Sequence, residues 1–167
     1  MIRFLPAVAI LITAFALVRP AAAEYAAGLR AYNEGNFESA ILELEPLVER
    51  GHSGAELMLG VMYLRGQGYR RDEGLAAVWM YKAARKGEAG AQLVLGSQLL
   101  YGRGVRRNVR EALMWLTLAG ESGIDSVAKQ AAIYRGDAIQ FLSPREVEEA
   151  LRKAKGFSPT PDKFTRQ

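Results

Sequence analysis

The chain has 167 residues, half of them hydrophobic, and its formal net charge is +4. This length and composition suffice for one folded domain with its own core and exclude a wholly disordered chain. The sequence has no cysteine and one histidine, which excludes a disulfide framework, a cysteine-linked lipid anchor and a multi-histidine metal site within one chain.

The first 23 residues have the pattern of a secretory signal peptide. A basic start at Arg3 precedes an apolar run over residues 4–18, and three alanines end at Ala23. The apolar run is shorter than the roughly 20 residues that a membrane-spanning helix needs. We therefore expect cleavage between Ala23 and Glu24, rather than a membrane anchor, and export to the periplasm or the exterior. Since the peptide carries two arginines and no acid, the basic charge is partly a targeting feature and does not indicate a nucleic-acid partner.

Residues 24–54 are predicted to form a first unit of two helices. Small and large apolar side chains alternate along this segment at helical spacing. The distance from Gly28 to Ala40 is four residues shorter than the distance from Gly60 to Ala76 in the following unit. We therefore expect a tighter turn between the two helices of the first unit, which in this respect resembles a tetratricopeptide repeat.

An internal repeat of 36 residues follows. Residues 55–60 match residues 91–96 at this shift. The shift also pairs glycines, arginines, alanines and tryptophans, including Gly66 with Gly102, Gly68 with Gly104, Arg70 with Arg106, Arg71 with Arg107, Trp79 with Trp115 and Gly87 with Gly123. A period between about 20 and 50 residues is typical of helical solenoids and other repeat arrays. The sequence therefore predicts two repeats, at residues 55–90 and 91–126.

Each repeat is predicted to contain two helices joined by a glycine-rich turn. Gly60 is small enough to let a neighbouring helix come close, and Gly66 and Gly68 can take the positive φ of a turn. Asp72 then stands where a short side chain can cap the second helix, and Gly87 stands where that helix ends. The second repeat has the same features 36 residues later, with asparagine in place of the aspartate.

These residues resemble the Sel-1-like repeat, a member of the tetratricopeptide-like superfamily. The matching positions are Gly60, Tyr63, Gly66, Gly68, Asp72, Ala76, Trp79, Tyr81, Lys82, Ala83, Ala84 and Gly87. The second repeat departs at Leu99, where tyrosine is usual, and at Thr117, which stands at the position of Tyr81. The resemblance implies an all-α fold, a short right-handed solenoid of stacked helical hairpins, and a role in binding proteins.

Residues 127–156 are expected to hold a partial repeat and a C-terminal capping helix. Ser143 begins that helix, with a proline in the first turn and a glutamate three residues after the serine. The helix has a single apolar stripe, formed by Val147, Ala150, Leu151 and Ala154. A helix of this kind can cover the last repeat and face water. Gly156 ends it, and residues 157–167 are predicted to form a disordered tail.

Patterns that could indicate catalysis have simpler explanations. His52 stands between two units with no second histidine in the chain, and the acids around Glu45 alternate with apolar residues as on a solvated helix face. The glycine-rich turns lack the strand and the Gly-Lys-Ser/Thr ending of a phosphate loop. Trp79 and Trp115 share a register, so we expect them to pack between helices rather than to stack on a sugar or a base. We expect no enzymatic activity, cofactor or metal.

The function that we predict is the binding of a partner protein, as a scaffold or a regulatory adaptor. Stacked hairpins form a concave face lined by the first helix of each unit, which suits an extended or helical segment of a partner. The repeat pattern places Tyr25, Leu29, Leu57, Val61, Leu64, Leu93, Ser97, Leu100 and Tyr101 toward that face. Because most of these residues are apolar, the face would favour a hydrophobic peptide or helix.

A second candidate surface consists of arginines in or beside the two glycine-rich turns. They are Arg70, Arg71, Arg103, Arg106, Arg107 and Arg110, and stacking of the units should gather them along one edge. Such an edge could bind an acidic polysaccharide, lipid headgroups or an acidic protein surface of the cell envelope. The arginines could equally be ordinary solubilising charge, and the sequence leaves both interpretations open.

Overall fold

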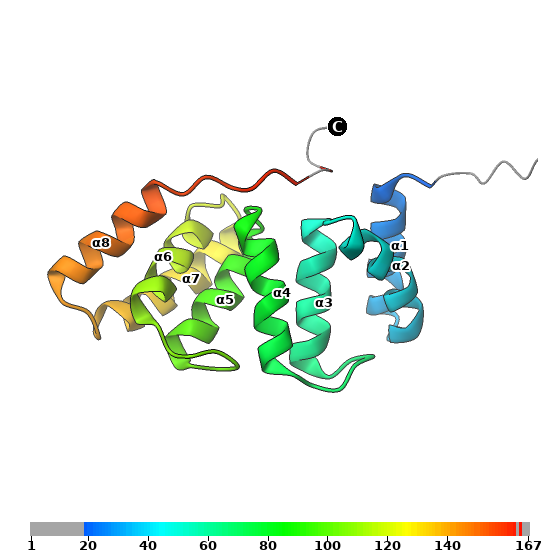
Figure 1. Cartoon of the computed structure of the whole chain (residues 1–167), viewed down its shortest axis with the longest axis horizontal. Coiled ribbons are helices and arrows are strands. Elements are labelled where there is room, and N and C mark those ends of the chain that lie inside the picture. Colours follow the sequence, from blue (N-terminus) through cyan, green and yellow to red (C-terminus); the bar gives the residue numbers. More distant parts are fainter. Residues whose placement is uncertain (1–18, 163, 165–167) are drawn as a thin grey trace, which may run out of the picture.

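The computed structural model describes residues 19–162 and Phe164, and within these residues the chain forms eight α-helices and no strand (Figure 1). The helices are α1 (Ala21–Asn33), α2 (Phe37–Glu49), α3 (Ser53–Arg65), α4 (Glu73–Arg85), α5 (Ala89–Tyr101), α6 (Val109–Gly120), α7 (Asp125–Ile139) and α8 (Pro144–Lys155). The first six pack as the hairpins α1–α2, α3–α4 and α5–α6, which stack in chain order. The predicted all-α solenoid of stacked hairpins is therefore confirmed.

The N-terminal part of the predicted signal peptide lies outside the described residues. Ala23 and Glu24, the predicted cleavage position, lie in the first turn of α1. Arg19 forms an ion pair with Glu43 (3.1 Å), and Glu24 forms one with Arg50. Both pairs join the beginning of the described chain to α2 or to the residue that follows it.

The helices repeat in the register that the sequence showed. The first helices α3, α5 and α7 begin at Ser53, Ala89 and Asp125, which are 36 residues apart, and α4 and α6 keep the same spacing. Each first helix begins two residues before the expected boundary of its unit. The partial repeat after residue 126 is therefore in register with the two complete ones, and α7 is its first helix.

Side-chain caps explain where the second helices begin. Asp72 Oδ1 accepts a hydrogen bond from the backbone N–H of Leu75 (2.8 Å), and Asn108 Oδ1 accepts one from that of Glu111 (3.2 Å). Each cap satisfies a backbone donor that has no partner within the helix. Ser143 forms the predicted reciprocal cap with Glu146 at the start of α8.

Close contact within each hairpin depends on a glycine in the first helix. A Cβ atom on Gly60 would lie 2.8 Å from Met80 Cε, and one on Gly96 would lie 2.7 Å from Leu116 Cγ. Met80 and Leu116 are fully buried, so these contacts lie in the core. The predicted role of Gly60 in close helix packing is therefore confirmed.

The glycine-rich turns also hold neighbouring units together. All four turn glycines have positive φ, between 68° and 74°, as the sequence predicted. A Cβ atom on Gly104 would lie 2.2 Å from the backbone oxygen of Glu73, at the start of the second helix of the preceding unit. Only glycine fits there, because the backbones of two units are in contact.

The last two helices do not form a hairpin like the others. α7 packs against α5 and α6, whereas α8 crosses to α6 and covers its outer side (Figure 1). Within the apolar stripe of α8, Ala150 and Ala154 are buried, while Leu151 is 38% exposed. The stripe therefore attaches α8 to the second helix of the last complete unit.

Described residues after α8 make contacts with the array, although the sequence predicted a disordered tail over residues 157–167. Residues 157–162 and Phe164, here called the C-terminal segment, run back along the array from α8 toward α3 (Figure 1). Thr160 donates its backbone N–H to the Arg85 oxygen (2.8 Å), and Asp162 accepts a hydrogen bond from the Ser53 N–H (2.9 Å). The structure differs from the prediction at residues 157–162, because a Ser-Pro-Thr-Pro run argues against a helix but not against contacts made by an extended chain.

Candidate protein-interaction surfaces

The first helices of successive units place equivalent side chains in rows. One row, here called the first-helix row, consists of Leu29 on α1, Val61 on α3, Ser97 on α5 and Ile133 on α7. The first three side chains are partly exposed, and Ile133 is 59% exposed. The row therefore presents a mainly apolar, partly accessible stripe that runs across the units.

Several predicted face residues have a second role in packing between units. Leu57, Val61 and Leu64 on α3 pack against the core cluster that contains the buried residues of α5. The ring of Tyr25 lies 4.7 Å from that of His52, and burial, followed by the nearby Glu88 carboxylate, raises the pKa of the Tyr25 phenol. These side chains are only partly available to a partner.

Leu100 does not lie on the accessible face as the sequence suggested. It is 1% exposed and belongs to the core cluster, because α5 is enclosed by α4, α6 and α7. Leu93 and Ser97, on the same helix, remain partly exposed. Leu100 is therefore a core residue and is removed from the candidate site.

Tyr101 is accessible but is also bound within the molecule. Its side chain is 43% exposed, and its hydroxyl donates a hydrogen bond to Asp137 Oδ2 on α7 (2.8 Å). This hydrogen bond is the main reason that the pKa of the Tyr101 phenol is raised. Its ring also meets that of Tyr134 edge-on, with the centroids 6.0 Å apart. Tyr101 therefore joins the last complete repeat to α7.

The arginine-rich turns lie at one edge of the array, as expected, but several arginines are engaged there. Figure 1 shows the α3–α4 and α5–α6 loops at the lower edge. Arg71 pairs with Glu73 (2.6 Å), and Arg107 donates to the Leu100 oxygen (2.9 Å) and lies over the ring of Phe141. Arg70, Arg103 and Arg106 are exposed, with Arg103 beside the ring of Tyr101.

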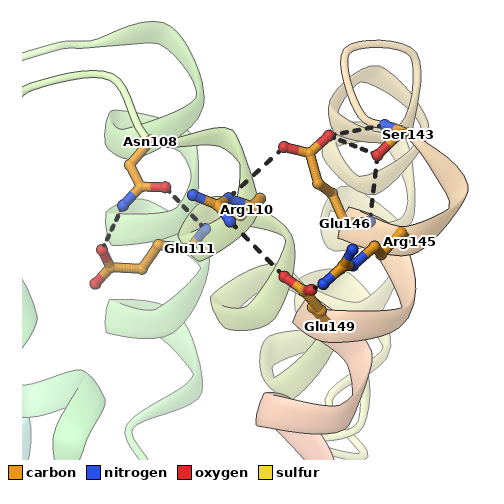
Figure 2. Close-up of polar contacts among 7 residues, drawn as sticks. All are labelled: Asn108, Arg110, Glu111, Ser143, Arg145, Glu146 and Glu149. Atoms are coloured by element: carbon orange, nitrogen blue, oxygen red, sulfur yellow. Dashed lines mark hydrogen bonds and ion pairs between the residues drawn. The ribbon is translucent and has the colours of Figure 1, made fainter.

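Arg110 points away from this edge toward α8 (Figure 2). Its guanidinium lies between Glu146 (3.8 Å) and Glu149 (3.7 Å), and Arg145 also contacts Glu149 (3.2 Å). The positive charge of Arg110 is therefore balanced by two carboxylates of α8. Fewer arginines are therefore available to an anionic partner at this edge than the sequence suggested.

A cavity of about 510 Å³ between α4, α6 and α8 was not foreseen. Trp115 and Phe157 form apolar walls, and Arg85 and Lys153 supply positive charge. Trp115 is 2% exposed, as its predicted packing role requires, whereas Trp79 is only partly buried and lies under the ammonium of Lys82. The cavity was missed because the apolar stripe predicts that α8 covers the last repeat but not which helix it packs against.

The arrangement of paired helices and the comparisons with known proteins together identify the family. A Sel1 repeat profile matches residues 53–88 and 89–124, which are the segments that contain α3–α4 and α5–α6. A solved Sel1 repeat protein from Oxalobacter formigenes is 30% identical, with a TM-score of 0.60, over 67% of this chain and 87% of that one. The chain belongs to the Sel1 repeat family.

A second Sel1-like structure covers more of the chain. It is a protective antigen present in uropathogenic Escherichia coli strains and displays an SLR fold, with 26% identity and a TM-score of 0.73 over 83% of this chain. The present chain spans only 30% of the length of that antigen. A search of curated proteins gives no match.

Sel1 repeat proteins are generally protein-interaction modules, and their fold is a known non-catalytic scaffold. Within the described residues, no group of three or more histidines or carboxylates could hold a metal ion. No helix in the same part of the chain is long and apolar enough to cross a membrane.

Proposed function

We propose that this Sel1 repeat protein is exported and binds an apolar segment of a partner protein along the first-helix row, as a scaffold or a regulatory adaptor. The family supports the binding of a protein in general. The basic start, the apolar run and the three alanines before Glu24 support export.

The exposure of the first-helix row is the observation that carries the proposed binding face. Three consecutive first helices each place a partly exposed side chain in the row, and α7 extends it with the exposed Ile133. Burial of such side chains under a partner stabilises a complex by about 25 cal/mol per Å² of apolar area before the costs of association. An amphipathic helix or an extended segment with one apolar side would fit this stripe.

Photocrosslinking in living cells tests the proposed face. A photoreactive amino acid at position 97 or 133 should crosslink to the same partner, because both positions lie in the row. Position 42 is the matched control, since Leu42 is 74% exposed but lies on the second helix α2. Fractionation of the same cells should find a chain that begins at Glu24 in the exported fraction.

Affinity for the identified partner then decides the proposal. We expect Ile133→Asp to weaken binding of the purified partner about tenfold or more, while Leu42→Asp leaves both affinity and melting temperature close to the native values. Equal crosslinking from all three positions would reject the first-helix row. An uncleaved chain that stays in the cytoplasm would reject export.

A further inference from the structure

The C-terminal segment lies on a surface formed by the end of α4, the start of α3 and Trp115 in the middle of α6. Its beginning contacts α6, its middle contacts the end of α4, and its last described residues contact the start of α3 (Figure 1). We call this the helix-end surface; it consists of His52, Ser53, Arg85, Gly87 and Trp115. An extended chain lies across it and adds no helix.

The first half of the segment uses one aromatic contact and one backbone carbonyl. Phe157 meets Trp115 edge-on, with the ring centroids 5.4 Å apart. Pro159 lies over Gly87, where an added Cβ atom would be 3.5 Å from the proline ring. Thr160 donates both its N–H (2.8 Å) and its hydroxyl (3.1 Å) to the oxygen of Arg85. Arg85 is the last residue of α4, and such carbonyls have no partner within their own helix.

The second half of the segment contacts the N-terminus of a helix, α3, whereas the first half contacts the C-terminus of α4. Asp162 is 4% exposed and accepts the backbone N–H of Ser53, the first residue of α3. Helix N-termini favour a negative charge at this place. Burial alone would raise the pKa of Asp162, but hydrogen bonds from the backbone of Ser53 and Phe164 outweigh it and lower the pKa. The ring of Phe164 lies 5.1 Å from that of His52.

The side chain of Thr160 leaves an empty space beside it on the surface. A hollow of about 220 Å³ beside it is also lined by Glu56, Lys82 and Lys86. Glu56 is 4% exposed, and its Oε1 bonds Lys86 Nζ (2.6 Å), but its Oε2 has no hydrogen-bond partner among the described residues. A buried acceptor without a donor costs free energy. A longer, neutral donor in place of Thr160 would extend into the hollow that Glu56 lines.

We propose that the helix-end surface is a peptide-binding site for an extended segment of another protein, and that the C-terminal segment competes for it from within the chain. The expected ligand has an aromatic residue, a proline, a hydrogen-bonding residue and an acid at the spacing of Phe157, Pro159, Thr160 and Asp162. The helix ends contribute mostly backbone atoms, so the site recognises this extended pattern rather than a folded surface. A better ligand than the chain's own segment carries glutamine at the position of Thr160.

The test uses the full chain and a labelled synthetic peptide with the sequence of residues 156–164. The native chain should bind the peptide weakly, because its own segment occupies the surface. The double variant Thr160→Pro/Asp162→Lys loses the N–H donor and the acid that hold the segment, and should bind the peptide about tenfold tighter or more. Ser158→Ala, at an exposed position of the same segment, should behave like the native chain.

Changes in the peptide test the individual contacts with the double variant. Glutamine at the position of Thr160 should strengthen binding, and lysine at the position of Asp162 should weaken it about tenfold or more. Ile133→Asp should leave peptide binding unchanged, which separates this site from the first-helix row.

Three outcomes would overturn the proposal. The folded double variant could bind no peptide, or it could bind the lysine peptide as well as the native one. Alternatively, light scattering could show a native dimer that the peptide dissociates, which would assign the surface to the C-terminal segment of a second copy.

Discussion

Single glycines at the turns decide how closely two units approach. Gly104 and Gly123 have nearly the same positive φ, 70° and 75°. They differ in surroundings, because a Cβ atom on Gly104 would meet the Glu73 backbone, whereas one on Gly123 would have nothing within 4 Å. Substitution of each glycine by alanine therefore distinguishes two costs. One is the conformational cost of a side chain at positive φ, and the other is the cost of pushing two units apart.

We expect Gly123→Ala to lower the free energy of unfolding by about 1 kcal/mol, the cost of the left-handed conformation alone. Gly104→Ala should lower it by roughly 3 kcal/mol, since backbone atoms must also move. Urea denaturation of the two variants measures the difference. Equal losses would mean that the turn tolerates a side chain against Glu73.

At the scale of the helices, α3 differs from its neighbours in the chemistry of its cap. His52 Nδ1 accepts the backbone N–H of Ala55 (3.2 Å), a role that asparagine or aspartate has at α2, α4 and α6. Burial is the main cause that lowers the pKa of His52, partly opposed by the charge of Asp162. A protonated Nδ1 cannot accept this hydrogen bond, so the cap depends on pH.

The native chain should lose stability between pH 7.5 and 5.5. The unfolded chain binds a proton on His52 near its ordinary pKa of 6.5, whereas the folded chain binds it only at lower pH. The stabilisation is therefore present above pH 6.5 and is lost as the pH falls. His52→Asn keeps a cap that does not titrate, and urea unfolding at the two pH values should show a smaller loss. An unchanged pH dependence would show that His52 does not control it.

The elements that could be predicted from the sequence are those with periodic or local signals. The 36-residue repeat predicted the positions of the second helices, and the Ser143 cap predicted the residue at which α8 begins. Leu100 was misplaced because α5 is apolar on nearly all sides, so its sequence does not distinguish the accessible side from the core. The C-terminal segment was missed because its main partners, the Arg85 carbonyl and the Ser53 N–H, are backbone groups without a sequence signature.

At the scale of the whole molecule, α8 is attached to the array mainly through α6. Ala150 is 2% exposed in this contact, whereas its neighbour Leu151 is 38% exposed. Units of a solenoid interact mostly with their nearest neighbours, so local damage need not spread along the array. Substitutions at positions 150 and 151 therefore test whether α8 can detach from the array without destabilising the first units.

We expect Ala150→Asp to release α8, because it buries a charge in the contact with α6 at a cost of roughly 3 kcal/mol. Hydrogen exchange should show lost amide protection across α8 and retained protection in α3 and α4. Leu151→Asp should leave the exchange of all three helices close to native. Loss of protection in α3 after Ala150→Asp alone would show that the two ends are coupled more strongly than nearest-neighbour packing implies.

The contact between Asp162 and Ser53 also sets an order of events during synthesis. These residues are 109 positions apart, whereas each hairpin joins helices that follow one another in the chain. Local hairpins form earlier than contacts that close long loops. The residues of the helix-end surface precede the C-terminal segment in the chain, so during synthesis and export a partner can reach the surface before the chain's own segment covers it.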